Sequence, residues 1–422
     1  MYRIIDYVIQ EKKMAGKGTG PLTGIRVLDL TQFESGTVCT ETLAWMGAEV
    51  LKVERPKTGE LARYSVAEPG KDTIGFNILN MNKKSLTCNM KTPEGLELIK
   101  KLIAKCDVMV ENMGPGAIDR LGLGYDVCKE INPKLVYAQI KGFGLDGPYK
   151  DYPAFNPIAT AMGGMSAVTG EPGGNPSQCG VSFADSGAGY ICAMSIIAAL
   201  YQCKNEGIGQ RVEVAMQDVV ICFARSCWEP YYNTGKPPRR VGAGMPLEDV
   251  APCNMYPCKP FGPNDFIQIY CSRHPGSTQW DQLCDVIGRP DLKQDANPDM
   301  ATPRSRFEHI DVVDGAIKDW LKDYDKMTAM DILCKAGVPT GAVLDCDDIT
   351  KDEYYRKRGI MAEVKTKDRG TLIMPGFAPR MSENHVKYKA SPALGNANKE
   401  IYEELLGYSD ADLKAMKEKG AI

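Results

Sequence analysis

The sequence has no excess of one charge and no long apolar run. It holds 51 Lys and Arg against 54 Asp and Glu, a formal net charge of -3 over 422 residues. A dedicated nucleic-acid binder needs basic side chains concentrated on one face, so that class is not expected. The most apolar stretch, Tyr190–Tyr201, is shorter than the roughly 18 residues that cross a bilayer, so no membrane span is expected.

Histidine is scarce, and the cysteines do not stand in a metal-binding pattern. The three histidines, His274, His309 and His385, are scattered, and no CxxC pair occurs. The sequence therefore predicts no metal site. Residues Met1–Gly16 lack the order of basic, apolar and small residues that marks a signal peptide. Fifteen cysteines, an odd number, without such a signal predict reduced thiols and a cytoplasmic protein.

What the sequence does have is alternation between apolar runs and helix-like stretches. Ile25–Leu30, Val38–Trp45 and Glu49–Val53 predict a strand, a helix and a second strand. Thr92–Glu94 predicts a helix start, with threonine as the cap and proline in the first turn. Ser409, with an aspartate three residues later, predicts the start of a C-terminal helix. The alternation predicts an α/β fold with a Rossmann-like parallel sheet.

Length and composition together predict the domain boundaries. At about 100 to 200 residues per domain, a chain of this length makes two or three structural units. After Val212–Met216 the composition becomes rich in aromatic residues and proline, with Trp228, Tyr231 and Tyr232 close together. The expected divisions are an N-terminal extension (1–21), a first part of a large α/β domain (22–225), a linker and small domain (226–337), and a return to the large domain (338–422).

A loop of small residues leads to an aspartate at a helix start. Gly163–Gly174 is rich in glycine, and Asp185 comes shortly before the apolar helix expected at Tyr190–Gln202. Taken alone, an aspartate in this position is most often a helix cap. A catalytic carboxylate is the alternative.

Several blocks of sequence stand in order along the chain: Leu22–Leu30, Gly47–Pro56, Asn80–Ser85, Glu111–Gly116 and Gly209–Asp218. Together they resemble the class III CoA-transferases, the family of formyl-CoA:oxalate CoA-transferase. The resemblance covers nearly the whole chain after residue 21 and is weakest between Gly235 and Ala336. It implies a large α/β domain with a smaller inserted domain, and an interlaced homodimer in which the aromatic segment near Trp228 is the crossing linker. A heteromer with a paralogous chain is the alternative.

The resemblance implies that Asp185 is the catalytic nucleophile. A carboxylate can attack the thioester of an acyl-CoA to form a mixed anhydride, and the released thiolate can then attack the enzyme's carbonyl. The product is an aspartyl-CoA thioester, from which an acceptor acid takes CoA by the reverse steps. Neighbouring glycines let backbone N–H groups approach the developing oxyanion. Coenzyme A and acyl-CoA are thus implied as substrates, beside a small organic acid, with no tightly bound cofactor.

The resemblance also implies which residues bind CoA. Its phosphates call for guanidinium or ammonium groups beside backbone donors. The family's CoA contacts fall on Ser35, Arg55, Cys88, Asn89, Met90, Lys91, Asn112, Met113, Gly114 and Arg120. Each has a plainer alternative, because lone basic residues are usually solvated charges and methionines are usually core residues.

The chain departs from its oxalate-using relatives at the substrate pocket. Glu34 replaces a glutamine and, if ionised, would repel a small dianion such as oxalate. Phe155 replaces a tyrosine and lacks its hydroxyl donor. The family's glycine-rich loop falls at Gly242–Pro252, where only the beginning is rich in glycine. We therefore expect succinyl-CoA or a similar acyl-CoA as donor and an organic acid as acceptor, with formyl-CoA and oxalate as the alternative.

Three other functions are possible alternatives to CoA transfer. The α-methylacyl-CoA racemases resemble these transferases but use a histidine, which falls at Phe155, and phenylalanine cannot accept a proton. A nucleotide-dependent dehydrogenase is disfavoured because Thr31–Thr37 lacks the GxGxxG pattern. A catalytically inactive partner subunit of a CoA-transferase is the third alternative, and the presence of Asp185 argues against it.

Overall fold

The computed structural model describes residues 20–65, 68–244, 249–271 and 276–422. The predicted extension at 1–21 therefore lies almost wholly outside the described residues. So do His274 and the middle of the loop Gly242–Pro252.

The chain divides into two compact units. The larger unit takes in the residues up to Gly163, Gly180–Cys222 and Tyr354–Ile422, and the smaller unit takes in Gly164–Cys179 and Phe223–Glu353. The smaller unit thus includes residues 164–179 and ends later than the boundary expected at 337. The interlaced dimer and the domain boundaries stay predictions.

A parallel sheet forms the centre of the larger unit. Its strand order is β3-β2-β1-β4-β5-β6, and every neighbouring pair is parallel. The strands are β1 (Arg26–Asp29), β2 (Glu49–Glu54), β3 (Lys84–Thr87), β4 (Val108–Glu111), β5 (Val136–Lys141) and β6 (Arg211–Ala215). The predicted α/β fold with a parallel sheet is confirmed.

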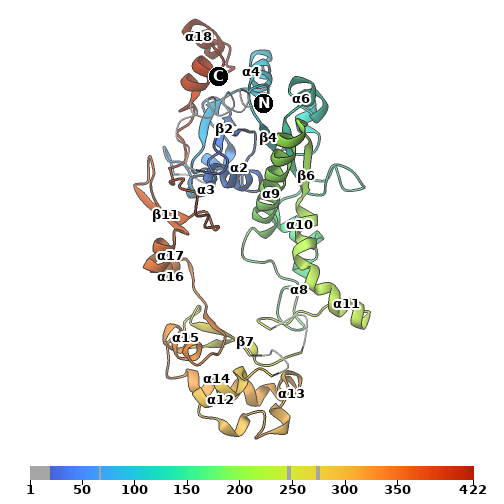
Figure 1. Ribbon diagram of the computed structural model, residues 1–422, viewed down its shortest axis with the longest axis vertical. Helices are drawn as coiled ribbons and strands as arrows, with labels where there is room; N and C mark the ends of the chain where they lie inside the picture. The colour runs from blue at the N-terminus through green and yellow to red at the C-terminus, as the bar shows by residue number, and fades with distance from the viewer. Residues whose placement is uncertain (1–19, 66–67, 245–248, 272–275) are drawn as a thin grey trace, which may run out of the picture. The chain divides into compact units, whose positions relative to one another are not determined.

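Helices and a hairpin complete the larger unit (Figure 1). The helices are α2 (Ser35–Trp45), η1 (Leu61–Arg63), α3 (Ile74–Leu79), α4 (Pro93–Ile103), α5 (Ala117–Arg120), α6 (Tyr125–Ile131), α7 (Asn156–Met162), α9 (Phe183–Glu206), α10 (Met216–Phe223), α17 (Glu353–Arg358), η5 (Glu400–Leu405) and α18 (Asp410–Glu418). The antiparallel hairpin joins β10 (Met361–Lys365) to β11 (Thr371–Pro375). Helices α10 and α17 each cross the unit boundary by one residue.

The smaller unit has an antiparallel sheet of three strands in the order β7-β8-β9. Its elements are α8 (Met165–Val168), η2 (Ala224–Cys227), α11 (Trp228–Thr234), β7 (Cys253–Pro257), β8 (Phe266–Tyr270), α12 (Gln279–Val286), η3 (Pro290–Leu292), η4 (Pro298–Met300), α13 (Pro303–Glu308), α14 (Ile310–Leu321), α15 (Lys326–Lys335), β9 (Thr340–Ala342) and α16 (Cys346–Lys351). Trp280, Leu283 and Ile317 belong to its separate hydrophobic core.

The expected helix starts at Thr92 and Ser409 are confirmed. The side chain of Thr92 accepts a hydrogen bond of 3.1 Å from the Gly95 backbone N–H at the start of α4. Ser409 and Asp412 form a capping box at the start of α18, each side chain accepting from the other's backbone N–H. These caps satisfy N–H groups that have no partner within the helix.

Helix α9 is longer than the sequence predicted. It has 24 residues and is long and apolar enough, by length and composition, to cross a membrane. The expectation that no segment approaches this length, based on Tyr190–Tyr201, is therefore corrected. One such helix within the described ranges is a weak indication, because the core helix of a soluble protein meets the same criterion. Here α9 contacts α2, β5 and β6 in the larger unit.

Candidate active site

A cavity of about 1110 Å³ opens in the larger unit. Its wall is built from the loops that follow β1, β2, β3, β4 and β5, that is, from the carboxyl ends of the parallel strands. The strand order reverses between β1 and β4, and ligands of open α/β sheets bind at such a switch point. The fold alone therefore marks this cavity as the candidate site.

Every residue that the resemblance assigned to the site lines this one cavity. They are Glu34, Ser35, Arg55, Cys88, Asn89, Met90, Lys91, Asn112, Met113, Gly114, Arg120, Phe155 and Asp185. They come from segments that lie far apart in the sequence, and the sheet brings them together. Their individual roles stay predictions.

Asp185 lies in the first turn of α9, which a residue from another segment caps. Oδ1 of Asn156 accepts hydrogen bonds from the backbone N–H of Ala184 at 2.8 Å and of Asp185 at 3.4 Å. Asn156 itself begins α7, directly after Phe155. Asn156 is a site residue that the sequence did not predict, because the helix it caps begins 27 residues further along the chain and no local pattern joins the two segments.

The close approach of α9 to α2 depends on a glycine. A Cβ atom on Gly189 would lie 2.6 Å from the Ser35 carbonyl oxygen and 2.8 Å from Cβ of Val38. Gly189 is one helical turn after Asp185, so the same contact brings Asp185 toward Glu34, the residue before Ser35. The helix packing thus sets the distance between the two carboxyl groups.

The environment of Asp185 favours its protonated form. Burial raises the pKa of Asp185 to about 7, and the nearby Glu34 carboxylate adds to the rise. Glu34 is itself held, because its Oε1 accepts a hydrogen bond of 2.7 Å from Oγ of Ser186. Near neutral pH the Asp185 carboxyl group is therefore balanced between its ionised, nucleophilic form and its neutral form.

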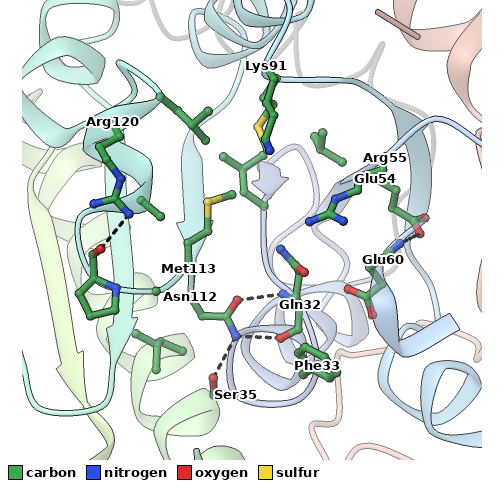
Figure 2. Close-up of a pocket in the computed structure, with 18 of the residues that line it drawn as sticks. Gln32, Phe33, Ser35, Glu54, Arg55, Glu60, Lys91, Asn112, Met113 and Arg120 are labelled. Atoms are coloured by element: carbon green, nitrogen blue, oxygen red, sulfur yellow. Dashed lines mark hydrogen bonds between the residues drawn. The ribbon is translucent and has the colours of Figure 1, made fainter. Parts of the chain in front are cut away.

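Asn112 joins the ends of β1 and β4 across the switch point (Figure 2). Its Oδ1 accepts from the Gln32 backbone N–H at 2.8 Å. Its Nδ2 donates to the Gln32 carbonyl oxygen at 2.8 Å and to Oγ of Ser35 at 3.1 Å. Between these contacts, Phe33 takes a positive φ of 56°, a conformation that L-residues rarely adopt. The side chain of Asn112 thus holds the loop that carries Glu34.

Buried charged side chains also hold the loop that carries Glu34. Nζ of Lys52 donates to the Thr31 carbonyl oxygen at 3.1 Å and to Oε2 of Glu60 at 2.7 Å. Asp29 accepts from the Thr31 backbone N–H at 2.8 Å and pairs with Nζ of Lys83 at 3.1 Å. Glu60 also reaches the cavity wall (Figure 2). Paired buried charges of this kind fix loop geometry, because breaking one pair leaves the other charge uncompensated.

Unpaired cations line the cavity. Arg55 and Lys91 are exposed side chains that extend toward the middle of the site (Figure 2), and neither has an ion pair within the described residues. Arg120 is also exposed, and among the described residues its guanidinium donates to one acceptor, the Pro115 carbonyl oxygen at 3.3 Å. Cationic groups without a carboxylate partner suit an anionic ligand such as a phosphate.

The apolar and thiol side chains of the predicted set have structural contacts. Cys88 is 2% exposed, its Sγ donates to the Gly95 carbonyl oxygen at 3.3 Å, and burial raises its pKa to about 12. Met90 and Met113 pack against the hydrophobic core of the larger unit. Burial and the raised pKa thus favour a protonated thiol at Cys88 over a reactive thiolate.

Comparison with known proteins decides the family. The model of CoA-transferase family III matches residues 22–398. The chain belongs to the class III CoA-transferases. It is 37% identical to the formyl-CoA:oxalate CoA-transferase of Bradyrhizobium sp. (strain ORS 278), covering 96% of this chain and 98% of that protein. With the enzyme of the same name from Streptomyces avermitilis it shares 38% identity, over 96% of this chain and 100% of that protein.

Solved structures agree with the class III CoA-transferase fold. A CAIB/BAIF family protein from Brucella suis superposes with a TM-score of 0.79 at 29% identity, covering 92% of this chain and 100% of that one. Rv3272 from Mycobacterium tuberculosis gives a TM-score of 0.75 at 26% identity, covering 90% and 99%. The resemblance read from the sequence motifs, and the CoA-transferase activity it implied, are confirmed at the level of the family.

No histidine is among the described residues of the cavity wall. Phe155, at the position of the racemase histidine, is 66% exposed. Within the described ranges, no three His, Cys, Asp or Glu side chains gather closely enough to hold a metal ion.

Proposed function

We propose that this CoA-transferase moves CoA from an acyl-CoA donor to an organic acid through an aspartyl-CoA thioester on Asp185. The observation that carries the proposal is the position of Asp185. Its carboxyl group lies in the first turn of α9 and lines the same cavity as the unpaired Arg55 and Lys91. One cavity thus offers a nucleophile for the thioester and cations for the phosphates of CoA.

The proposed steps balance without any added reagent. An Asp185 carboxylate oxygen attacks the thioester carbonyl, the C–S bond breaks, and a mixed anhydride and the CoA thiolate result. The thiolate then attacks Cγ of Asp185, which releases the donor acid as its carboxylate. The acceptor carboxylate attacks the new thioester at Cγ, and the thiolate finally attacks the acceptor's carbonyl carbon and restores the Asp185 carboxylate. Each step exchanges one acyl–oxygen or acyl–sulfur bond for another, so the thioester energy is conserved.

Glu34 and Phe155 support a choice of substrate other than oxalate. Glu34 already raises the pKa of Asp185, so an incoming dianion would meet a second negative charge in a partly desolvated site. Phe155 has no hydroxyl to donate to a second carboxylate. We propose a donor such as succinyl-CoA, whose second carboxylate is separated from the thioester by a methylene chain, and an acceptor with a single carboxylate near the reacting atoms.

The assembly and compartment belong to the same proposal. Trp228, Tyr231 and Tyr232 of the smaller unit are 49%, 41% and 79% exposed, and such aromatic surface suits a contact with a second chain. We propose a homodimer, with a paralogous chain as the alternative partner.

All fifteen cysteines lie within the described residues and are free. Free thiols in this number support a reducing compartment such as the cytoplasm.

The proposal is tested by measuring CoA transfer with a panel of donors and acceptors. The wild-type protein should move CoA from at least one acyl-CoA to an added acid, and Asp185→Asn should abolish the transfer. Oxalate should be a poor acceptor, and Glu34→Gln should improve it. CoA binding without turnover across the panel would favour the inactive-subunit alternative. Exchange of the α-hydrogen of an acyl-CoA in D₂O without transfer would favour the racemase.

A further inference from the structure

The C-terminal segment forms part of the cavity wall. Lys417, in the last turn of α18, lines the same cavity as Asp185, and so do Gly420 and Ile422. The family model ends at residue 398. The motifs that assigned the site also end well before this segment, so neither gives these residues a role.

Specific contacts hold the segment in place. The Asn89 backbone N–H donates to the Ala421 carbonyl oxygen at 2.8 Å, and Nδ2 of Asn89 donates to the Gly420 carbonyl oxygen at 3.3 Å. Ala421 is 0% and Ile422 is 8% exposed, and both belong to the core that also holds Met416. The position of Lys417 is therefore set by backbone hydrogen bonds and by burial on both sides of it in the sequence.

The same asparagine links this segment to a predicted CoA contact. Oδ1 of Asn89 accepts from the Lys91 backbone N–H at 3.2 Å, while its N–H groups hold the chain just after Lys417. Lys91 and Lys417 are both exposed, and neither has an ion pair within the described ranges. By contrast, Lys419 is paired with Glu94 at 2.6 Å, outside the cavity wall. Two ammonium groups that line one cavity, without an ion pair in the described ranges, favour a ligand with several anionic oxygens.

We propose that Lys417 binds a phosphate group of coenzyme A, together with Lys91. This inference rests on the proposed function and adds to it a residue from the C-terminal helix. An ammonium group serves as a point charge with several donors, which suits a phosphate that is free to rotate among them. The contact lies at the nucleotide end of CoA, away from the thioester, so it contributes to binding equally before and during the reaction.

The test compares Lys417→Ala with Lys414→Ala. Lys414 is exposed, lies one turn earlier on α18 and does not line the cavity, so it controls for loss of a charge from the same helix. Calorimetry measures the affinity of each variant for CoA, for 3′-dephospho-CoA, which lacks the 3′-phosphate, and for pantetheine, which lacks all the phosphates. Lys417→Ala should weaken CoA binding about five-fold, the size of one exposed ion pair, and leave pantetheine binding unchanged. If Lys417→Ala weakens the binding of 3′-dephospho-CoA as much as the binding of CoA, the contact is to the diphosphate. If the binding of 3′-dephospho-CoA is unchanged, the contact is to the 3′-phosphate.

Kinetics give an independent readout. Lys417→Ala should raise KM for the acyl-CoA and leave kcat unchanged, because the lost interaction is equal in the ground and transition states. Unchanged CoA affinity in Lys417→Ala, or an equal loss in Lys414→Ala, would overturn the inference while CoA binding by the wild-type protein stands. If the wild-type protein binds no CoA at all, the proposed function itself fails.

Discussion

Ser186 donates a hydrogen bond of 2.7 Å from its Oγ to Oε1 of Glu34. This bond joins the first turn of α9 to the residue that precedes α2, directly beside the proposed nucleophile. It holds a carboxylate close to Asp185, where a neutral glutamine would leave the site less negative. The contact therefore affects both the acidity of the nucleophile and the choice of acceptor.

Glu34→Gln should change the pH dependence of the reaction. The nucleophile must be ionised, so kcat/KM should rise with pH up to the pKa of Asp185 at about 7. Removing the Glu34 charge removes one of the two causes that raise this pKa, so the acidic limb of the profile should move to lower pH. The profile is measured with one donor and acceptor pair over pH 5 to 9 for both proteins. An unmoved limb would show that Glu34 has no electrostatic effect on the nucleophile.

Asp185→Asn should stabilise the folded protein above neutral pH. The pKa of Asp185 is raised in the folded chain, so the folded state holds its proton more tightly than the unfolded state. Its contribution to the free energy of unfolding is therefore lost as pH rises from about 4 to about 7. The asparagine variant has no such loss, and it should gain on the order of 1 kcal/mol at pH 8, allowing for partial solvent access. Denaturant unfolding at pH 4 and pH 8 measures the difference, which should be small at the lower pH.

Gly189→Ala should reduce activity by forcing α9 away from α2. The added Cβ would lie 2.6 Å from the Ser35 carbonyl oxygen, which belongs to the helix backbone and cannot move aside alone. Overpacking of this kind costs about 1 to 3 kcal/mol of stability. We expect kcat to fall about ten-fold or more, since small displacements of a nucleophile are costly. Gly315→Ala in α14 is the matched control, because an added Cβ there meets nothing within 4 Å. Equal effects of the two changes would contradict the helix contact.

Asn156→Ala should lower both stability and kcat. The substitution removes the acceptor that caps α9 at Ala184 and Asp185, a loss of about 1 kcal/mol. Asn156→Asp keeps an acceptor and adds a negative charge near the nucleophile. Asn156→Asp should therefore have the melting temperature of the wild-type protein, and its activity should appear at a higher pH than that of the wild type. The two variants are compared by thermal unfolding and by pH profiles. An aspartate variant with the wild-type pH profile would rule out the predicted electrostatic effect.

Asn112→Asp should disturb the loop that carries Glu34. Aspartate can accept from the Gln32 backbone N–H, but it cannot donate to the Gln32 carbonyl oxygen or to Oγ of Ser35. We expect kcat to fall about ten-fold while the melting temperature changes little, because the change is confined to one short loop. Stopped assays with saturating substrates measure kcat. A change confined to KM would instead favour direct contact between Asn112 and CoA.

The sequence predicted the elements whose signals are local. Thr92 and Ser409 marked helix starts through their own capping patterns, and the motif around Asp185 could be matched to the family without any structure. The parallel sheet followed from the alternation of strands and helices. The resemblance assigned Arg55, Lys91 and Asn112 to one site, whereas the strand order and the switch point beside which they lie came from the structure.

Contacts between distant segments could not be predicted in this way. Asn156 caps a helix from another segment, and Lys417 lines the cavity where Asn89 and the core hold the chain around it. Both contacts depend on tertiary structure, which hydrophobic periodicity and motif spacing in the sequence do not indicate. The true length of α9 was missed for a different reason, since small residues such as Gly189 and Ser186 interrupt the apolar run without ending the helix.

The most direct test of the account is to trap the enzyme-bound thioester. The protein is mixed with a donor acyl-CoA, without acceptor, and then treated with hydroxylamine, which converts an aspartyl thioester to a hydroxamate. Peptide mass spectrometry should find the hydroxamate at Asp185, dependent on the donor and absent when acceptor is added in excess. A protein that completes CoA transfer while Asp185 remains unmodified, or that keeps wild-type turnover after Asp185→Asn, would contradict the account.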